Sequence, residues 1–134
     1  MTPEGKVKAQ VKKGLRPIAR LWEFMPVQNG MGKPALDFLI CVNGHFIAIE
    51  TKAKGKKLTT RQEHTKAELE AAGAKVFVVD DDASCTVAVE YILAASRTEI
   101  DVRDDHIDAL LGIPLAVRMN RAIRAVLNEE KDKE

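Results

Sequence analysis

Asp37 and the tripeptide Glu50-Thr51-Lys52 are the residues of this chain whose types and spacing most favour chemistry. Between them lie two apolar runs separated by Asn43-Gly44, a pattern that predicts a β-hairpin with a two-residue turn. In that register, paired residue numbers sum to 87, so Asp37 opposes Glu50. Because side chains alternate along a strand, we expect both carboxylates and Lys52 on one face of the sheet.

Two carboxylates in direct opposition are unstable without a partner. Directly opposed side chains have Cβ atoms about 4.5–5.5 Å apart, and like charges at that distance destabilise the pair. The pair therefore requires a cation or a shared proton. Lys52 is one candidate cation, and a divalent metal such as Mg²⁺, which binds carboxylate and phosphate oxygens, is the other. The alternative interpretation is that Asp37 caps a strand while Glu50 and Lys52 form a surface pair.

The two faces of the predicted hairpin differ in composition. One face is continuously apolar and is expected to be buried; it comprises Phe38, Ile40, Val42, Ile47 and Ile49. The face that carries the carboxylates is smaller and mixed, with Leu39, Cys41, Phe46 and Ala48. We expect this second face to look into a cleft, with Cys41 as a small packed hydrophobic residue.

Helices and further strands are predicted around the hairpin. Thr2-Pro3 is a helix-start signature, and the helix is expected to end at Leu15, before Pro17. Thr59 opens a second helix that ends near Gly73. The remaining expected elements are a strand at 21–25, a buried strand at 75–80, a loop at 28–34, helices at 85–95, 106–111 and 115–127, an acidic connection at 101–105 and a charged tail at 129–134.

The composition is that of one globular domain of 134 residues, with 46% hydrophobic and 31% charged residues. No apolar run approaches the ~18 residues of a membrane-spanning helix, and the amino terminus does not resemble a secretory signal. Two cysteines support neither a disulfide framework nor a cysteine zinc site, so we expect a reducing cytoplasm. The net charge of +1 combines +8 over residues 1–66 with −7 over residues 67–134. This asymmetry indicates a nucleic-acid-binding face on the first half.

Three segments of the chain together resemble a known nuclease family. They are Gly32-Lys33-Pro34-Ala35-Leu36-Asp37, Ile49-Glu50-Thr51-Lys52-Ala53 and Thr59-Thr60-Arg61-Gln62. This string resembles the virus-type replication-repair nuclease (VRR-NUC) branch of the PD-(D/E)xK superfamily, especially stand-alone phage versions. One departure is that two residues separate Pro34 from Asp37.

The resemblance covers about residues 2–80 and implies a fold. The expected α/β (α+β) architecture is a restriction-endonuclease-like core with a mixed sheet, in the order helix-strand-strand-strand-helix-strand. C-terminal helical additions over about residues 83–134 complete a single domain of residues 1–134.

The resemblance also implies roles for individual residues. Asp37 and Glu50 would hold a Mg²⁺ or Mn²⁺ ion, helped by the backbone carbonyl of Thr51, and Lys52 would position the attacking water. Glu4 matches an acid of the first helix that reaches the metal directly or through water. Its alternative role is to interact with the helix dipole.

The helix after the hairpin contributes Gln62, which matches a polar residue that orients groups near the site. Thr59-x-x-Gln62 is also a capping box, which alone would explain Gln62. The cations expected to contact phosphates flank the site at its open end: Lys54, Lys56, Lys57 and Arg61.

The implied reaction is hydrolysis of a phosphodiester that leaves 5′-phosphate and 3′-hydroxyl ends. The expected substrate is branched, flapped or four-way-junction DNA in phage replication, recombination or repair, cut by a homodimer without membrane or nucleotide cofactor. Two alternatives are a non-catalytic DNA-binding module with the same fold and a restriction-like, sequence-specific nuclease. The latter would need a recognition domain for which the chain leaves little room.

Overall fold

A computed structural model describes residues 1–97 together with residues 112, 114 and 123. The chain divides into two compact units, Met1–Ser96 and Arg97–Glu134, and the first of these contains every strand described. The acidic connection, the last two helices and the tail expected from the sequence lie almost entirely outside the described residues.

The first unit is built on a four-stranded mixed sheet with the strand order β1-β2-β3-β4. Strand β1 spans Leu21–Phe24, β2 spans Phe38–Val42, β3 spans His45–Thr51 and β4 spans Lys75–Val79. Strands β1 to β3 pair antiparallel, and β4 runs parallel to β3. The predicted fold class and the predicted order of elements are therefore confirmed for the first unit.

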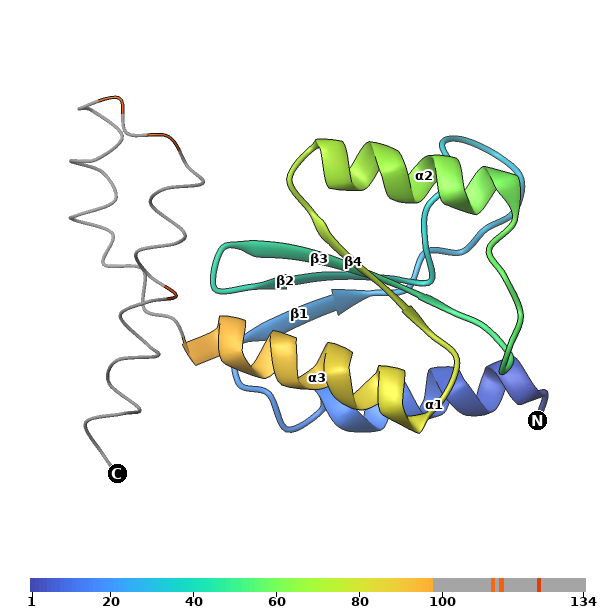
Figure 1. Cartoon of the computed structure of the whole chain (residues 1–134), viewed down its shortest axis with the longest axis horizontal. Coiled ribbons are helices and arrows are strands. Elements are labelled where there is room, and N and C mark those ends of the chain that lie inside the picture. The colour runs from blue at the N-terminus through green and yellow to red at the C-terminus, as the bar shows by residue number, and fades with distance from the viewer. Residues whose placement is uncertain (98–111, 113, 115–122, 124–134) are drawn as a thin grey trace. The chain divides into compact units, whose positions relative to one another are not determined.

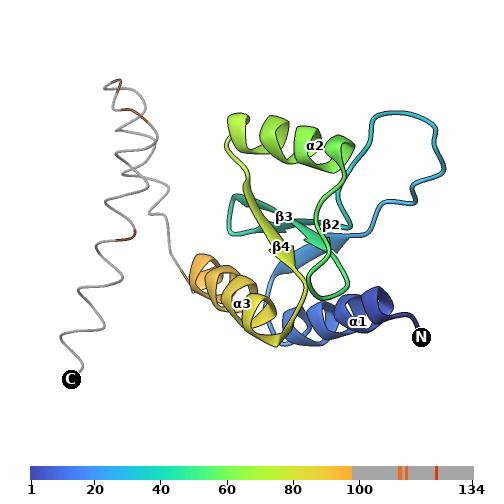
Figure 2. The same ribbon diagram turned by 45° about the vertical axis from the view of Figure 1, so that its right-hand side comes forward.

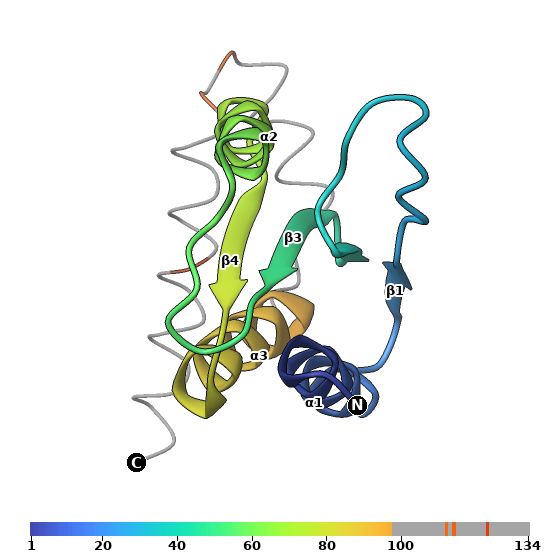
Figure 3. The same ribbon diagram turned by 90° about the vertical axis from the view of Figure 1, so that its right-hand side faces the viewer.

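Helices cover the two faces of this sheet unequally (Figures 1 and 3). Helix α1 (Pro3–Leu15) and helix α3 (Asp82–Arg97) lie on one face, and of the helices within residues 1–97 only α2 (Thr60–Ala71) lies on the other. The core lies between the sheet and the α1–α3 layer and includes Phe38, Ile40 and Ile47, all fully buried. Helix α2 buries only Thr65, so its face of the sheet is covered much less completely.

The hairpin of β2 and β3 forms in the predicted register. Asn43 and Gly44 have φ angles of 47° and 76°, the left-handed values that a type I′ two-residue turn requires. Val42 consequently pairs with His45, and the pairing continues to Phe38 opposite Ile49. The end of this ladder places Asp37 next to the carboxyl end of β3.

Helix α1 follows its sequence signals closely. Thr2 Oγ1 accepts a hydrogen bond from Gly5 N at 3.0 Å, which caps the helix, and Pro3 occupies the first turn. Val7, Val11 and Leu15 are buried, as their spacing predicts. The amino end of α1, with Glu4, is thereby fixed near the end of β3.

Helix α3 begins three residues before the predicted helix and ends two residues after it. Asp81 Oδ1 accepts a hydrogen bond from Ser84 N at 2.8 Å, so the acidic run 80–82 forms the helix start. Cys85, Ala88 and Ile92 are buried in the same core as α1. The helical addition expected from about residue 83 thus begins as part of the core.

Two further features frame the open face of the sheet. The loop between β1 and β2 projects from the sheet on the side of α2 (Figures 2 and 3), and Lys33 Nζ in this loop lies 2.9 Å from Glu68 Oε2 on α2. Strand β4 was expected to be buried, but only Val79 is, because β4 is an edge strand beneath the sparsely packed α2.

None of the described helices is long and apolar enough to cross a membrane.

Candidate active site

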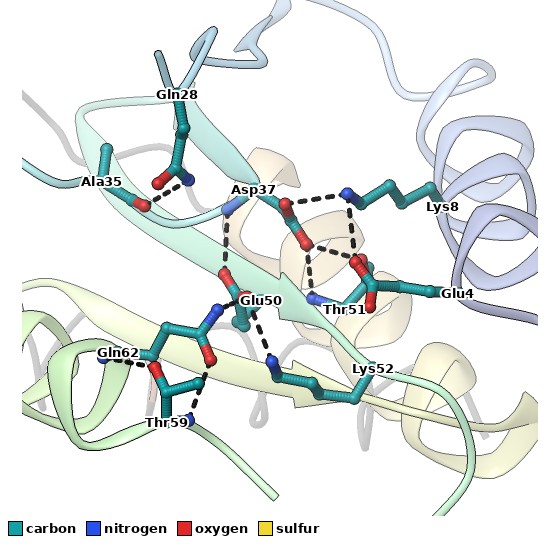
Figure 4. Close-up of polar contacts among 10 residues, drawn as sticks. All are labelled: Glu4, Lys8, Gln28, Ala35, Asp37, Glu50, Thr51, Lys52, Thr59 and Gln62. Carbon is teal, nitrogen blue, oxygen red and sulfur yellow. Dashed lines mark hydrogen bonds and ion pairs between the residues drawn. The ribbon is translucent and has the colours of Figure 1, made fainter. Parts of the chain in front are cut away.

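Residues from four elements meet where β2 begins and β3 ends (Figure 4). The hairpin contributes Asp37 and the Glu50-Thr51-Lys52 tripeptide, α1 contributes an acid and a lysine, and α2 contributes Gln62. The structure therefore brings together all the residues that the sequence assigned to catalysis and metal binding.

Glu50 is buried, with 3% of the residue exposed, and its two carboxylate oxygens have different partners. Oε1 accepts a hydrogen bond from Gln62 Nε2 at 2.5 Å and lies 3.9 Å from Lys52 Nζ. Oε2 accepts a hydrogen bond from the backbone N–H of Asp37 at 3.1 Å. Burial first, and then the negative charge of Asp37, raise the pKa of Glu50 to about 7, although the Asp37 N–H, Lys52 and Lys8 oppose the rise.

The carboxylate of Asp37 is held by Thr51 of β3 and by Lys8 of α1. Its Oδ2 accepts hydrogen bonds from Thr51 N at 3.0 Å and Thr51 Oγ1 at 2.6 Å, and its Oδ1 lies 3.0 Å from Lys8 Nζ on α1. The prediction that both carboxylates project from one face is wrong, because Asp37 turns toward Thr51 and toward Lys8 of α1. Glu50 instead points to the face covered by α2, where it contacts Gln62. Asp37 precedes the first residue of β2, so the alternation of a regular strand does not fix its side chain.

Lys8 is a site residue that the sequence interpretation missed. Its Nζ lies 3.3 Å from Glu4 Oε1 as well as 3.0 Å from Asp37, so one ammonium links two of the carboxylates proposed as metal ligands. Burial opposes the charged form, but hydrogen bonds and charges of Asp37 and Glu4 raise the pKa of Lys8 above its ordinary value. The four-residue spacing of Glu4 and Lys8 places them on one face of α1, which is the signal that could have revealed the lysine.

Gln62 makes the contacts that both interpretations of this residue require. Its Oε1 accepts a hydrogen bond from Thr59 N at 3.0 Å and its backbone N–H donates to Thr59 Oγ1 at 3.2 Å, which completes the capping box. Its Nε2 donates to Glu50. Capping fixes the amide group of Gln62 so that its N–H donor reaches the buried carboxylate.

The cations proposed for phosphate contact lie beside the tripeptide in the chain. Lys54, Lys56 and Lys57 are exposed in the loop that leaves β3, and Arg61 is exposed in the first turn of α2, next to Gln62. The charge of Lys54 contributes, after hydrogen bonds from Ser84, to holding the pKa of Asp81 below its ordinary value. The basic loop adjoins the site because it follows Lys52 almost directly in the chain, at the carboxyl end of β3.

The donors of the site fit a hard divalent cation by type. Carboxylates and a backbone carbonyl are the oxygen ligands that Mg²⁺ takes in proteins. The ammonium of Lys8 already occupies a position between Glu4 and Asp37 where a cation is stabilised. Among the residues that the structure describes, however, no three His, Cys, Asp or Glu side chains converge as a ready-made metal site. In the described arrangement lysines, Thr51, Gln62 and a backbone N–H satisfy the carboxylates.

On the sheet face that carries Glu50, the expectation that Cys41 is packed is wrong. Cys41 is exposed rather than packed, as are Trp22 and Phe46, which flank it in the register of β1 to β3. The reason is that α2 covers only the β3–β4 side of this face (Figure 3). The sequence pattern identifies the two faces but not how far a helix covers each.

Comparisons with known proteins agree with the architecture. No family model matches the chain, and no curated protein matches it. Among solved structures, the chain is similar to one described as a "VRR_NUC domain", with a TM-score of 0.59 and 22% sequence identity. The match covers 68% of this chain and 98% of the other. The chain therefore has the fold of a VRR-NUC domain, as its motif string predicts.

Proposed function

We propose that this protein is a metal-dependent endonuclease that hydrolyses phosphodiester bonds of DNA. The observation that carries the proposal is the buried Glu50 carboxylate, held between Asp37 and Lys52 at the end of a hairpin in a VRR-NUC fold. A buried acid opposed to a second acid is costly for stability, and a DNA-binding surface does not need one.

The proposed ligands of a Mg²⁺ or Mn²⁺ ion are Asp37, Glu50 and the carbonyl of Thr51, with Glu4 direct or through water. When bound, such an ion polarises a phosphoryl oxygen and lowers the pKa of a coordinated water. Lys52 places a positive charge next to Glu50, where it can orient a water molecule and stabilise charge on the phosphate. Gln62 holds the Glu50 carboxylate in a fixed orientation through Nε2.

The exposed cations at the carboxyl end of β3 support DNA as the substrate. The proposed phosphate contacts are those of Lys54, Lys56, Lys57 and Arg61, and they lie in the basic half of the chain. We further propose that the enzyme prefers branched, flapped or four-way-junction DNA and acts as a homodimer in the cytoplasm. Two copies related by a two-fold axis would place a pair of sites on the opposed strands of a junction.

The function is tested by incubating end-labelled linear duplex, single strand, 5′ flap and four-way junction with Mg²⁺, Mn²⁺ or EDTA. We expect metal-dependent cleavage of at least one substrate, with 5′-phosphate ends, and loss of cleavage in Asp37→Asn. Lys13→Gln, an exposed residue in the last turn of α1, is the control for handling and folding. Cleavage in EDTA, or by Asp37→Asn at the rate of the unmodified protein, would contradict the proposal. Binding without cleavage would favour the DNA-binding module.

A further inference from the structure

Three exposed aromatic side chains share the sheet face that carries Glu50. Trp22 is 61% exposed, Phe24 is 49% exposed and Phe46 is 43% exposed. Trp22 pairs with Cys41, which pairs with Phe46, and Phe24 pairs with Leu39, so alternation puts all three rings on one face. They are half of the six aromatic residues of the chain, which concentrates rings where burial does not require them.

The aromatic residues lie in line with the candidate active site. Along β3, Phe46 precedes Glu50 by four residues, which corresponds to about 14 Å at ~3.4 Å per residue. Phe24 lies in the row between, because its partner Leu39 pairs with Ala48. The rings of Trp22 and Phe24 are nearly parallel, with an interplanar angle of 14° and centroids 5.9 Å apart. The face thus carries two neighbouring rings on β1, those of Trp22 and Phe24, and a third ring, that of Phe46, on β3.

The chemistry of this face favours nucleobases over a protein partner. The exposed surface of the three aromatic residues is about 300 Å², so they would supply less than half of the ~800 Å² per partner of a stable protein interface. Aside from Glu50, the face carries no acid from β1 to β3, because Glu23 pairs with the buried Ile40 and points to the other side. Aromatic rings bind nucleobases by stacking, and only bases released from a duplex present their faces.

We propose that Trp22, Phe24 and Phe46 form a stacking platform for unpaired bases of the DNA strand next to the cleavage site. This inference rests on the proposed function and specifies its substrate class: DNA with unpaired nucleotides close to the scissile phosphate. The duplex portion is bound through phosphates by the basic loop, and the platform adds affinity that a fully paired substrate cannot gain.

Trp22 is the single tryptophan of the chain, so its fluorescence reports on the platform directly. The experiment uses the full chain carrying Asp37→Asn, in EDTA, titrated with oligothymidylate or with a duplex of equal length. We expect Trp22 to be accessible to a neutral quencher in the free protein. We also expect its fluorescence to fall as the single strand binds and to change little with the duplex.

Labelled-oligonucleotide anisotropy then compares variants. Trp22→Ala and Phe46→Ala should each weaken single-strand binding about 5-fold or more, since stacking contributes ~1–3 kcal/mol per base, and should leave duplex binding within twofold. Trp22→Phe keeps a ring and should retain most of the affinity. Val87→Ala removes an exposed apolar side chain of α3, on the opposite layer, and should have no effect.

Several results would overturn the platform. Two of them concern DNA binding: single-strand binding with unchanged Trp22 fluorescence, and a loss of duplex affinity in Trp22→Ala equal to the loss of single-strand affinity. The other two concern the free protein: a Trp22 ring that is already shielded from the quencher, and conversion of a dimer to a monomer by Trp22→Ala. The last two would show that the face is covered by the chain itself or by a second copy. The two proposals fail separately: metal-dependent cleavage without Trp22 quenching rejects only the platform, and quenching without cleavage rejects only the nuclease.

Discussion

At the scale of single residues, Glu50 combines deep burial with a negative neighbour, and both raise its pKa to about 7. An acid whose pKa is higher in the folded state keeps its proton there while the unfolded chain has lost it. Below the unfolded pKa of about 4.5, both states hold the proton, and Glu50 does not lower the free energy of unfolding. The free energy of unfolding falls as the pH rises from there through about 7. Charging Glu50 in the metal-free protein therefore costs about 3 kcal/mol, since one pKa unit corresponds to ~1.4 kcal/mol.

Glu50→Gln removes that charge, and its effect should depend on pH. In EDTA at pH 8, we expect the variant to be about 2 kcal/mol more stable than the unmodified protein, because the lost carboxylate acceptor offsets part of the gain. At pH 4.5 that advantage should be absent. Urea unfolding of both proteins at several pH values measures the difference. A constant difference across this range would contradict the raised pKa.

Lys8 should compete with the metal for Asp37 and Glu4, because its ammonium lies within 3.3 Å of both. Replacing it by methionine keeps most of the apolar stem and removes the charge. We expect Lys8→Met to bind Mn²⁺ about 3- to 10-fold more tightly and to be about 1 kcal/mol less stable in EDTA. Calorimetric titration and urea unfolding measure the two quantities, with Lys13→Met as the control. Weaker Mn²⁺ binding by Lys8→Met would show that the lysine supports the ligands instead.

The sequence predicts the site only as far as local structure determines it. Glu50 and Lys52 follow from a hairpin whose turn and register are local, and Gln62 follows from its capping box. The turn of Asp37 toward Thr51 and Lys8 depends on how α1 docks against the end of β3. Docking of elements distant in sequence is set by packing, which the hydrophobic pattern of either element does not specify.

At the scale of elements, the contact between α1 and α3 depends on a small residue. A Cβ placed on Gly14 would lie 2.7 Å from Val89 Cγ2, closer than real Cβ contacts come. Valine has little rotamer freedom in a helix, so it cannot move aside easily. Gly14 therefore allows the two helices to approach over the core.

Gly14→Ala should destabilise the protein, although alanine is the better helix former. Overpacking costs ~1–3 kcal/mol and the gain in helix propensity is about 1 kcal/mol, so we expect a net loss of about 1 kcal/mol. Adding Val89→Ala should remove the clash and make Gly14→Ala neutral or stabilising in that background. Urea unfolding of the four proteins measures this coupling. Additive effects would mean that the helices do not meet at Gly14.

Elements themselves were more predictable than the way they cover one another. The caps at Thr2 and Thr59 and the Asn43-Gly44 turn are formed by neighbouring residues, and all three were predicted correctly. Cys41 was wrongly expected to pack, because its alternation is right but α2 does not extend over it. Alternation assigns a side chain to a face, and only the tertiary arrangement determines whether that face is covered.

At the scale of the molecule, the basic first half is expected to dominate the encounter with DNA. Each lysine that neutralises a phosphate releases counterions, so affinity falls with salt. Lys56 and Lys57 are exposed beside the site, whereas Lys12 and Lys13 lie in the last turn of α1, at the end away from Glu4. The two pairs carry the same charge and differ in position.

Lys56→Gln/Lys57→Gln should weaken DNA binding and reduce the slope of log affinity against log salt by about 1–2. The same substitutions at Lys12 and Lys13 should change the slope by much less. Fluorescence anisotropy at several salt concentrations, in EDTA, provides the slopes. Equal slopes for the two double variants would mean that net charge, rather than the basic loop, determines binding.

Lys52, beside Glu50, is expected to take part in phosphodiester hydrolysis rather than in folding or binding. The most direct measurement is single-turnover cleavage of the preferred DNA in Mg²⁺ by the unmodified protein and by Lys52→Met, with DNA affinity and unfolding measured in parallel. We predict a loss of cleavage rate of at least about 100-fold in Lys52→Met, with affinity changed by no more than a few fold. Cleavage by a folded, DNA-bound Lys52→Met at the unmodified rate would contradict the account.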